Sequence, residues 1–308
     1  MEKIKINTIT NPEIIIKVVN KIEDTKKNVF INLLIKKDKT GEWIYKAGAN
    51  WPEEANIDYK LFIKLLIEKD KTGKWIYNAG TDWPKKEVDY KLFTKLLIEK
   101  DKTGEWIYNA GAYWPKEAKI DYKLFKKLLL ERDKTGEWIY NAGISWPKKE
   151  VSYKLFTKAL IKKDKRGGCI YDAGKNWPKE KVDYKLFTKA LIKKDKRGSL
   201  ICYAGSEWPE GGYIDFDLFT KALKEKDETG ELIYQAGAFW PDEANIVYKL
   251  FAKELIEKDK TGEWIYKAGK YWPIEEVDYN LFAEELIERD EIGKWIEKAK
   301  NDWPEWSE

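Results

Sequence analysis

Residues 89–120 read DYKLFTKLLIEKDKTGEWIYNAGAYWPKEAKI, and close copies of this unit fill most of the chain. Each copy contains a Trp-Pro pair, which occurs nine times at steps of 31 or 32 residues. A period of this length predicts a stacked repeat array, although a length of 308 residues would otherwise suggest two globular domains. The tryptophans of the pairs are Trp51, Trp83, Trp114, Trp146, Trp177, Trp208, Trp240, Trp272 and Trp303.

Each unit is expected to form two helices. In the first, apolar residues follow a helical spacing, as at Tyr59, Leu61, Phe62, Leu65 and Leu66. An Asp or Ser suited to capping a helix precedes each one. The second helix covers Glu-Trp-Ile-Tyr-Asn-Ala-Gly and about two more residues, and it must stop at the Trp because the next residue is proline. The expected caps are Asp58, Asp89, Asp121, Ser152, Asp183, Asp215 and Asp278.

The predicted fold class is therefore all-α, an α-solenoid of about nine tandem helix-turn-helix repeats of 31–32 residues. A hairpin of this size cannot bury a core alone, so neighbouring hairpins must share one. We expect residues 1–27 to form an N-terminal capping segment with a helix over 14–22. Residues 28–303 are expected to form the array, and residues 304–308 a C-terminal tail.

Comparison of the copies within the chain separates constant from variable positions. The residues at Leu61, Phe62 and Leu66 recur in every first helix from the second copy onward, and the Trp of Trp-Pro never changes. We interpret these positions as scaffold; a platform for stacking ligands is the alternative for the tryptophans. The Gly of Ala-Gly becomes Lys300 only in the last copy, which indicates close packing against a following repeat rather than a positive φ. The turn Lys-Asp-Lys-Thr-Gly is also nearly constant, although packing does not obviously constrain it.

Two adjacent residues between Ala-Gly and Trp-Pro differ in every copy. Their second members supply the candidate binding residues Asn50, Asp82, Tyr113, Ser145, Asn176, Glu207, Phe239 and Tyr271. Drift at a solvated helix end is the alternative interpretation. Large apolar groups at Tyr113, Ile144, Phe239 and Tyr271 argue mildly against drift, because a wet, unselected site would carry fewer of them.

This arrangement resembles that of TAL-effector DNA-binding repeats, and pentatricopeptide RNA-binding repeats use a comparable logic. In both families a uniform hairpin carries one or two specifying side chains per repeat. The resemblance concerns organisation alone. The residues around the variable pair match neither family's repeat, so no binding code carries over.

The first helices also carry lysines four residues apart, which share a helix face and predict a basic ladder along the array. Lys154, Lys158, Lys185 and Lys189 are its candidate binding residues. Residues 151–200 contain 15 Lys and Arg against five Asp and Glu, whereas residues 271–308 contain four against 12. One interpretation is that the ladder binds phosphates or an acidic partner. The alternative is that it is ordinary solvated surface. Arg is scarce, which weakens the nucleic-acid interpretation.

The composition argues against catalysis. The chain has no His, the commonest general base and metal ligand, and its two cysteines, Cys169 and Cys202, occupy non-equivalent positions without disulfide or metal spacing. Both are expected to be buried, reduced thiols. Its carboxylates recur in every unit, whereas a catalytic pair would be singular. We therefore expect no enzyme activity, no cofactor and no metal. No apolar run is long enough for a signal peptide or a membrane span, so the expected location is cytoplasmic.

These observations favour a non-catalytic repeat scaffold that binds a protein or peptide partner through the solenoid surface. The alternative is a modular nucleic-acid-binding repeat protein that uses the variable pair and the lysine ladder. The oligomeric state does not follow from the sequence.

Overall fold

The computed structural model describes residues 24–50, 57–209 and 211–304, and all structural statements concern these residues. They form eighteen α-helices and no strand. Consecutive helices pair into nine hairpins, each with a first (A) and a second (B) helix. The predicted all-α repeat fold is therefore confirmed. The expected helix over 14–22 and most of the expected capping segment lie outside the described residues.

The A helices share a length of eleven residues from the second hairpin onward, and every B helix has nine. The A helices are α2 (Asp24–Lys37), α4 (Tyr59–Lys69), α6 (Tyr90–Lys100), α8 (Tyr122–Arg132), α10 (Tyr153–Lys163), α12 (Tyr184–Lys194), α14 (Phe216–Lys226), α16 (Tyr248–Lys258) and α18 (Tyr279–Arg289). The B helices are α3 (Glu42–Asn50), α5 (Lys74–Asp82), α7 (Glu105–Tyr113), α9 (Glu137–Ser145), α11 (Gly168–Asn176), α13 (Ser199–Glu207), α15 (Glu231–Phe239), α17 (Glu263–Tyr271) and α19 (Lys294–Asp302). Short 3-10 turns follow several Trp-Pro pairs: η3 (Lys85–Glu87), η4 (Lys116–Ala118), η5 (Lys148–Glu150), η6 (Lys179–Lys181), η7 (Asp242–Ala244) and η8 (Ile274–Glu276).

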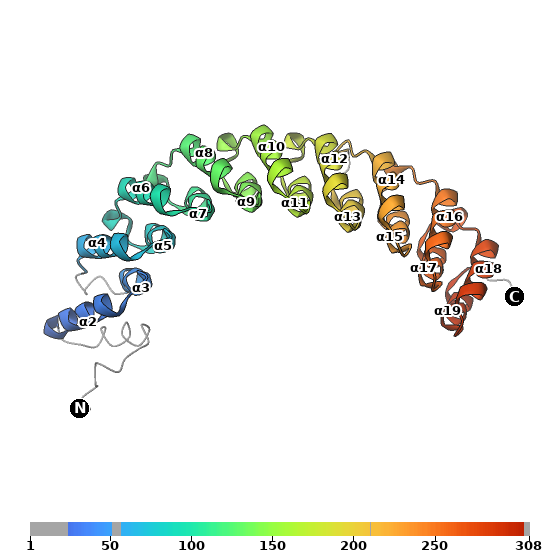
Figure 1. The fold of residues 1–308 in the computed structure, drawn as a ribbon, viewed down its shortest axis with the longest axis horizontal. Coiled ribbons are helices and arrows are strands. Elements are labelled where there is room, and N and C mark those ends of the chain that lie inside the picture. The colour runs from blue at the N-terminus through green and yellow to red at the C-terminus, as the bar shows by residue number, and fades with distance from the viewer. Residues whose placement is uncertain (1–23, 51–56, 210, 305–308) are drawn as a thin grey trace, which may run out of the picture. The chain divides into compact units, whose positions relative to one another are not determined.

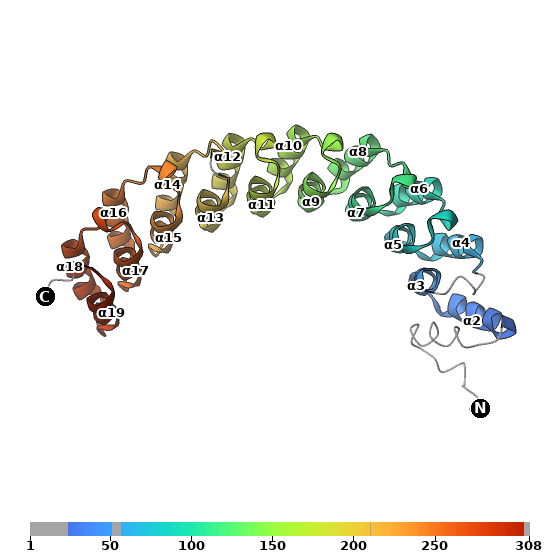
Figure 2. The ribbon, with the colours of Figure 1, turned by 180° about the vertical axis from the view of Figure 1, so that it is seen from behind.

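The chain divides into two compact units, and the division falls in the fourth hairpin. The first unit extends to Lys134 and includes Asn141–Ser152, and the second contains Thr135–Tyr140 and the described residues from Tyr153 onward. Within each unit, A helices lie in one layer and B helices in another (Figures 1 and 2). Within the units, a B helix contacts the next B helix and the next A helix, as α5 contacts α6 and α7 in the first unit and as α15 contacts α16 and α17 in the second.

The helix ends follow the local chemistry that the sequence predicts. The carboxylates of Asp58, Asp89, Asp121, Asp183, Asp215 and Asp278 each accept a hydrogen bond from the backbone N–H three residues later. Where the end of a B helix is described in this detail, it lies at the tryptophan of Trp-Pro and the backbone there is extended, as at Trp83 and Trp208. The predicted aspartate caps named above and the predicted stop at Trp-Pro are confirmed for these helices.

The constant turn between A and B helices is tightly constrained by contacts that were not obvious from the sequence. Asp70 is buried, and its Oδ1 accepts hydrogen bonds from the N–H groups of Thr72 and Gly73. Its Oδ2 accepts from the N–H groups of Trp75 and Ile76, the first turn of α5. Gly73 has a φ of 90°, which L side chains rarely adopt. The Asp and Gly of this turn are therefore fixed by backbone hydrogen bonds and backbone geometry.

The tryptophan of Trp-Pro packs between consecutive hairpins. Its indole Nε1 donates to a backbone carbonyl of the preceding B helix, as Trp114 donates to Tyr77 at 3.0 Å. The same bond joins Trp83 to Tyr45 and Trp208 to Tyr171. The described tryptophans of these pairs are all buried, and they are Trp83, Trp114, Trp146, Trp177, Trp208, Trp240, Trp272 and Trp303. The scaffold interpretation is confirmed for these residues, and their burial leaves no face open for a stacked ligand.

The glycine of Ala-Gly is confirmed as a close-packing position. A Cβ added at Gly80 would lie 2.6 Å from Cε2 of Trp114 in the next hairpin. Its equivalents Gly48 and Gly237 lie in the same way against Trp83 and Trp272. The indole therefore presses against bare backbone, and no side chain fits between.

The prediction that both residues of the recurring Leu-Phe pair form the core is half wrong. The phenylalanine is almost fully buried in each hairpin from the second onward, as at Phe62 and Phe156. The leucine before it is exposed at Leu61, Leu155 and elsewhere. Adjacent helical residues point about 100° apart, so only one of the pair can face the core.

A substitution pair in α11 tests this packing. We expect Gly174→Ala to lower the free energy of unfolding by about 1–3 kcal/mol, because the new methyl would overlap the indole of Trp208. Gly168→Ala in the same helix is the control, since nothing lies within 4 Å of the added Cβ. Urea unfolding followed by circular dichroism measures both variants. Equal stability of the two would contradict the close-packing account.

Candidate binding surfaces

The variable pair lies at the C-terminal end of each B helix, and in several hairpins its second residue contacts the tyrosine of the preceding B helix. Every one of the eight second residues named as candidates is exposed: Asn50, Asp82, Tyr113, Ser145, Asn176, Glu207, Phe239 and Tyr271. The constant tyrosines Tyr45, Tyr77, Tyr108, Tyr140, Tyr171, Tyr234 and Tyr266 run along the same layer. Sequence reasoning did not assign these tyrosines to the site.

Polar residues at the variable position bind the tyrosine hydroxyl of the hairpin before. Tyr171 donates to the Glu207 carboxylate, and Tyr45 donates to Asp82 in the same way. Asn176 Nδ2 donates to the hydroxyl oxygen of Tyr140 at 2.9 Å. Ser145 and Asp302 form equivalent contacts with Tyr108 and Tyr266. At these hairpins the variable residue already has a partner within the array.

Electrostatics reinforce one of these contacts. Burial raises the pKa of Tyr171, and the hydrogen bond to Glu207 raises it further, so the hydroxyl remains a donor at neutral pH. Hydrogen bonds from Lys175 and Tyr171 lower the pKa of Glu207. Lys175 Nζ lies 2.6 Å from the Glu207 carboxylate. Lys175 and Glu207, which belong to two successive variable pairs, therefore both take part in the contact between consecutive hairpins.

In the seventh and eighth hairpins the variable residue is aromatic instead. The ring of Tyr234 lies 6.4 Å from that of Phe239 and 6.5 Å from that of Tyr271, and it stacks on Trp264 at 5.6 Å. Tyr234 is buried, whereas Phe239 is 61% exposed and Tyr271 56% exposed. Phe239 also follows the one hairpin in which Cys202 replaces the tyrosine, so no hydroxyl is available there. We call Tyr234, Phe239 and Tyr271 the aromatic cluster.

The lysine ladder lies on the other layer. Lys154, Lys158, Lys185 and Lys189 are exposed on the A helices α10 and α12. The structure therefore does not bring them together with the variable pairs: among the described residues, neither a hydrogen bond nor an ion pair joins the two groups. The leucines between these lysines, Leu155 and Leu186, were not predicted as surface residues.

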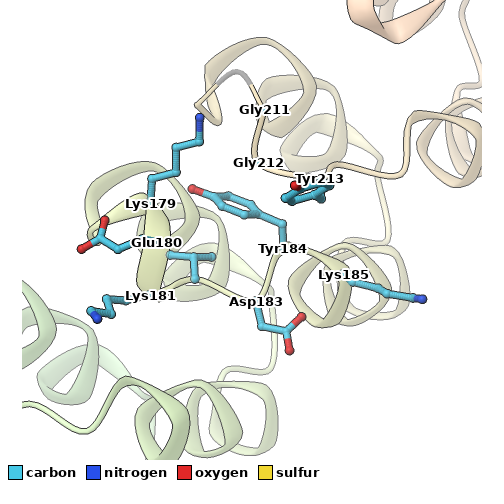
Figure 3. Close-up of a pocket in the computed structure, with 10 residues that line it drawn as sticks. Lys179, Glu180, Lys181, Asp183, Tyr184, Lys185, Gly211, Gly212 and Tyr213 are labelled. Atoms are coloured by element: carbon cyan, nitrogen blue, oxygen red, sulfur yellow. The ribbon is translucent and has the colours of Figure 1, made fainter.

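A cavity of about 630 Å³ opens beside α12, where the loop of the sixth hairpin departs from the repeat (Figure 3). Lysines from η6 and the start of α12 line it, together with the ring of Tyr184 and the segment from Gly211 to Tyr213. Two other loops of the array have Lys-Lys-Glu-Val after Trp-Pro, at 85–88 and 148–151, whereas this loop contains Gly-Gly-Tyr at 211–213. Sequence reasoning did not single out this loop, although its departure from the other copies is visible in the sequence.

The two cysteines differ in their surroundings. Cys202 is buried as expected, whereas Cys169 is only partly buried, which corrects that prediction. Burial raises the pKa of the Cys202 thiol to about 12, and the carboxylates of Asp227 and Glu231 add to the shift. Its Sγ lies 3.7 Å from the carbonyl oxygen of Leu232. A thiol in this state is a poor nucleophile.

In the described part of the chain, no cluster of three His, Cys, Asp or Glu side chains is arranged to hold a metal ion. Within the same residues, no helix is both long enough and apolar enough to cross a membrane. No protein-family model matches the sequence, and no curated protein matches it.

Among solved structures, a chain from the computational design of self-assembling cyclic protein homooligomers aligns with 96% of this chain and 84% of its own length. The two are 15% identical, and the TM-score is 0.12. A score this low carries no argument about partners or assembly.

The thiols provide a test of the described burial. In native protein at pH 8 we expect Cys169 to react with a thiol reagent much faster than Cys202, because a pKa of about 12 leaves only about one thiolate in ten thousand. Cys202 should react after unfolding in guanidinium. The Cys169→Ser variant should lose the fast phase, and equal rates for both thiols in the native state would contradict the burial of Cys202.

Proposed function

We propose that this protein is a non-catalytic, cytoplasmic repeat scaffold that binds a peptide or protein partner through side chains at the variable positions. The observation that supports this proposal is the aromatic cluster of the seventh and eighth hairpins. Two large aromatic side chains, Phe239 and Tyr271, are more than half exposed beside a buried third ring. Aromatic side chains of this kind dominate the binding energy of protein interfaces.

The other positions of the array support a binding role rather than a chemical one. The carboxylate oxygens of the recurring aspartates, such as Asp70 and Asp259, accept hydrogen bonds from backbone N–H groups. The buried thiol of Cys202 has a raised pKa. The groups most suited to chemistry are therefore engaged in holding the hairpins together, while the exposed groups are varied from hairpin to hairpin.

A modular nucleic-acid-binding function is the second candidate, and the exposed lysines of α10 and α12 favour it. Lysines neutralise phosphates without reading sequence. Variable residues that already bind a neighbouring tyrosine, such as Asp82 and Glu207, would have to exchange that hydrogen bond to read a base. We therefore place this function second.

The proposal is tested by selecting random 12-residue peptides on display against the full chain. Enriched peptides are then titrated against the Phe239→Ala/Tyr271→Ala variant by calorimetry. We expect at least tenfold weaker binding, because truncating an interface aromatic commonly costs about 1–2 kcal/mol. Circular dichroism confirms that the variant keeps its helicity.

The matched control is Ser206→Ala/Asn301→Ala, which truncates two exposed residues of other variable pairs. It should bind the selected peptides within twofold of the unaltered chain. The proposal is wrong if no peptide is enriched, or if the aromatic variant and the control bind equally well.

A further inference from the structure

The A helices α10 and α12 have the same sequence, YKLFTKALIKK, and present the same exposed side chains. In α10 these are Lys154, Lys158 and Lys162, which are spaced four residues apart and so share one helix face. Leu155 lies beside them and is 48% exposed. The equivalent residues of α12 are Lys185, Lys189 and Lys193, with Leu186 at 43% exposure.

These two helices contact each other within the second unit, so their exposed faces form one surface, which we call the lysine–leucine face. One exposed position near the end of the A helix separates these two helices from the other A helices of the second to ninth hairpins. Lys162 and Lys193 occupy it here, and elsewhere in those hairpins it is glutamate: Glu68, Glu99, Glu131, Glu225, Glu257 and Glu288. The face therefore lacks the acidic residue that accompanies the lysines in those hairpins.

The carboxylates closest to these lysines in the sequence have other partners. Asp164 and Asp195 are buried and accept backbone N–H groups of their own turns. Asp183 caps α12. Among the described residues, the six lysines of the face form no ion pair with a carboxylate. The face thus presents six lysine side chains that are available to an anionic partner.

The two leucines indicate the class of that anion. Each leaves almost half of an apolar side chain in water, and burying that surface against a partner would favour binding. A phosphate backbone or a purely acidic chain would leave these leucines hydrated. An acidic segment that also carries apolar side chains would satisfy the lysines and the leucines together.

We infer that the lysine–leucine face of α10 and α12 is a docking surface for an acidic amphipathic peptide segment. This surface lies on the A-helix layer, whereas the aromatic cluster lies on B helices. It is thus a second binding surface that goes beyond the proposed function of the variable positions. The A helix of the ninth hairpin offers a contrast, because α18 keeps the exposed leucine, Leu281, but has Asn280 and Glu284 in the lysine positions.

The test uses the full chain and a fluorescein-labelled 18-residue peptide in which leucines at helical spacing alternate with glutamates. Fluorescence anisotropy at about 150 mM salt gives its affinity. Comparison ligands are a glutamate homopolymer of the same charge, a 20-nucleotide single-stranded DNA and phosphatidylserine vesicles. We expect the amphipathic peptide to bind at least tenfold more tightly than the glutamate homopolymer and the DNA, with no comparable vesicle binding.

Two variants probe the two components of the face. Lys158→Glu/Lys189→Glu should weaken peptide binding at least tenfold, and Leu155→Gln/Leu186→Gln at least fivefold. Lys86→Glu/Lys148→Glu makes the same change in net charge at exposed lysines of the first unit and should stay within twofold. The Phe239→Ala/Tyr271→Ala variant should bind this peptide normally, so failure of one surface is distinguishable from failure of the other.

The inference is overturned if the homopolymer, the DNA or the vesicles bind as tightly as the amphipathic peptide, because the leucines would then contribute nothing. It is also overturned if the peptide does not bind, or if the control variant loses as much affinity as Lys158→Glu/Lys189→Glu. In that last case net charge, rather than this face, would govern binding.

Discussion

The hydrogen bond from the tryptophan indole to a backbone carbonyl of the preceding hairpin is the contact on which the array depends. It recurs at each described Trp-Pro pair, as from Trp177 to Tyr140 and from Trp272 to Tyr234. The same indole presses against a glycine of the preceding B helix, such as Gly237. One side chain thus satisfies a polar group, fills the core and sets the spacing of consecutive hairpins. Stability in such an array resides in the interfaces between hairpins.

Much of this fold follows from short-range chemistry and is predictable from the sequence. The caps, the stop at Trp-Pro and the bare glycine each depend on residues within one or two hairpins. The burial of Asp70 and the exposure of Leu61 were missed, for two physical reasons. A buried carboxylate is recognisable only once its backbone donors are placed. The side of an A helix that faces solvent depends on the rotation between hairpins, which periodicity alone does not give.

The structure likewise changed the interpretation of the candidate site. Comparison of the copies located the variable pair, but it could not show that residues such as Asn176 and Glu207 reach the tyrosine of another hairpin. Several polar variable residues therefore contribute to contacts between consecutive hairpins, and the aromatic ones are those that we propose for recognition. The A layer carries the exposed lysines of α10 and α12, and the B layer carries the exposed rings of Phe239 and Tyr271. Constant residues hold the hairpins together, and we propose that departures from the repeat mark the surfaces that bind partners.

Hydrogen exchange of the tryptophan indole N–H groups, measured by nuclear magnetic resonance on the intact chain, tests the central claim most directly. The account predicts strong protection for the indoles of the described Trp-Pro pairs, including Trp114 and Trp208, because their N–H groups are hydrogen-bonded between hairpins. The indoles of partly exposed tryptophans, such as Trp75 and Trp106, should exchange much faster. Equal exchange in the two groups would contradict the claim that these indoles join each hairpin to the next.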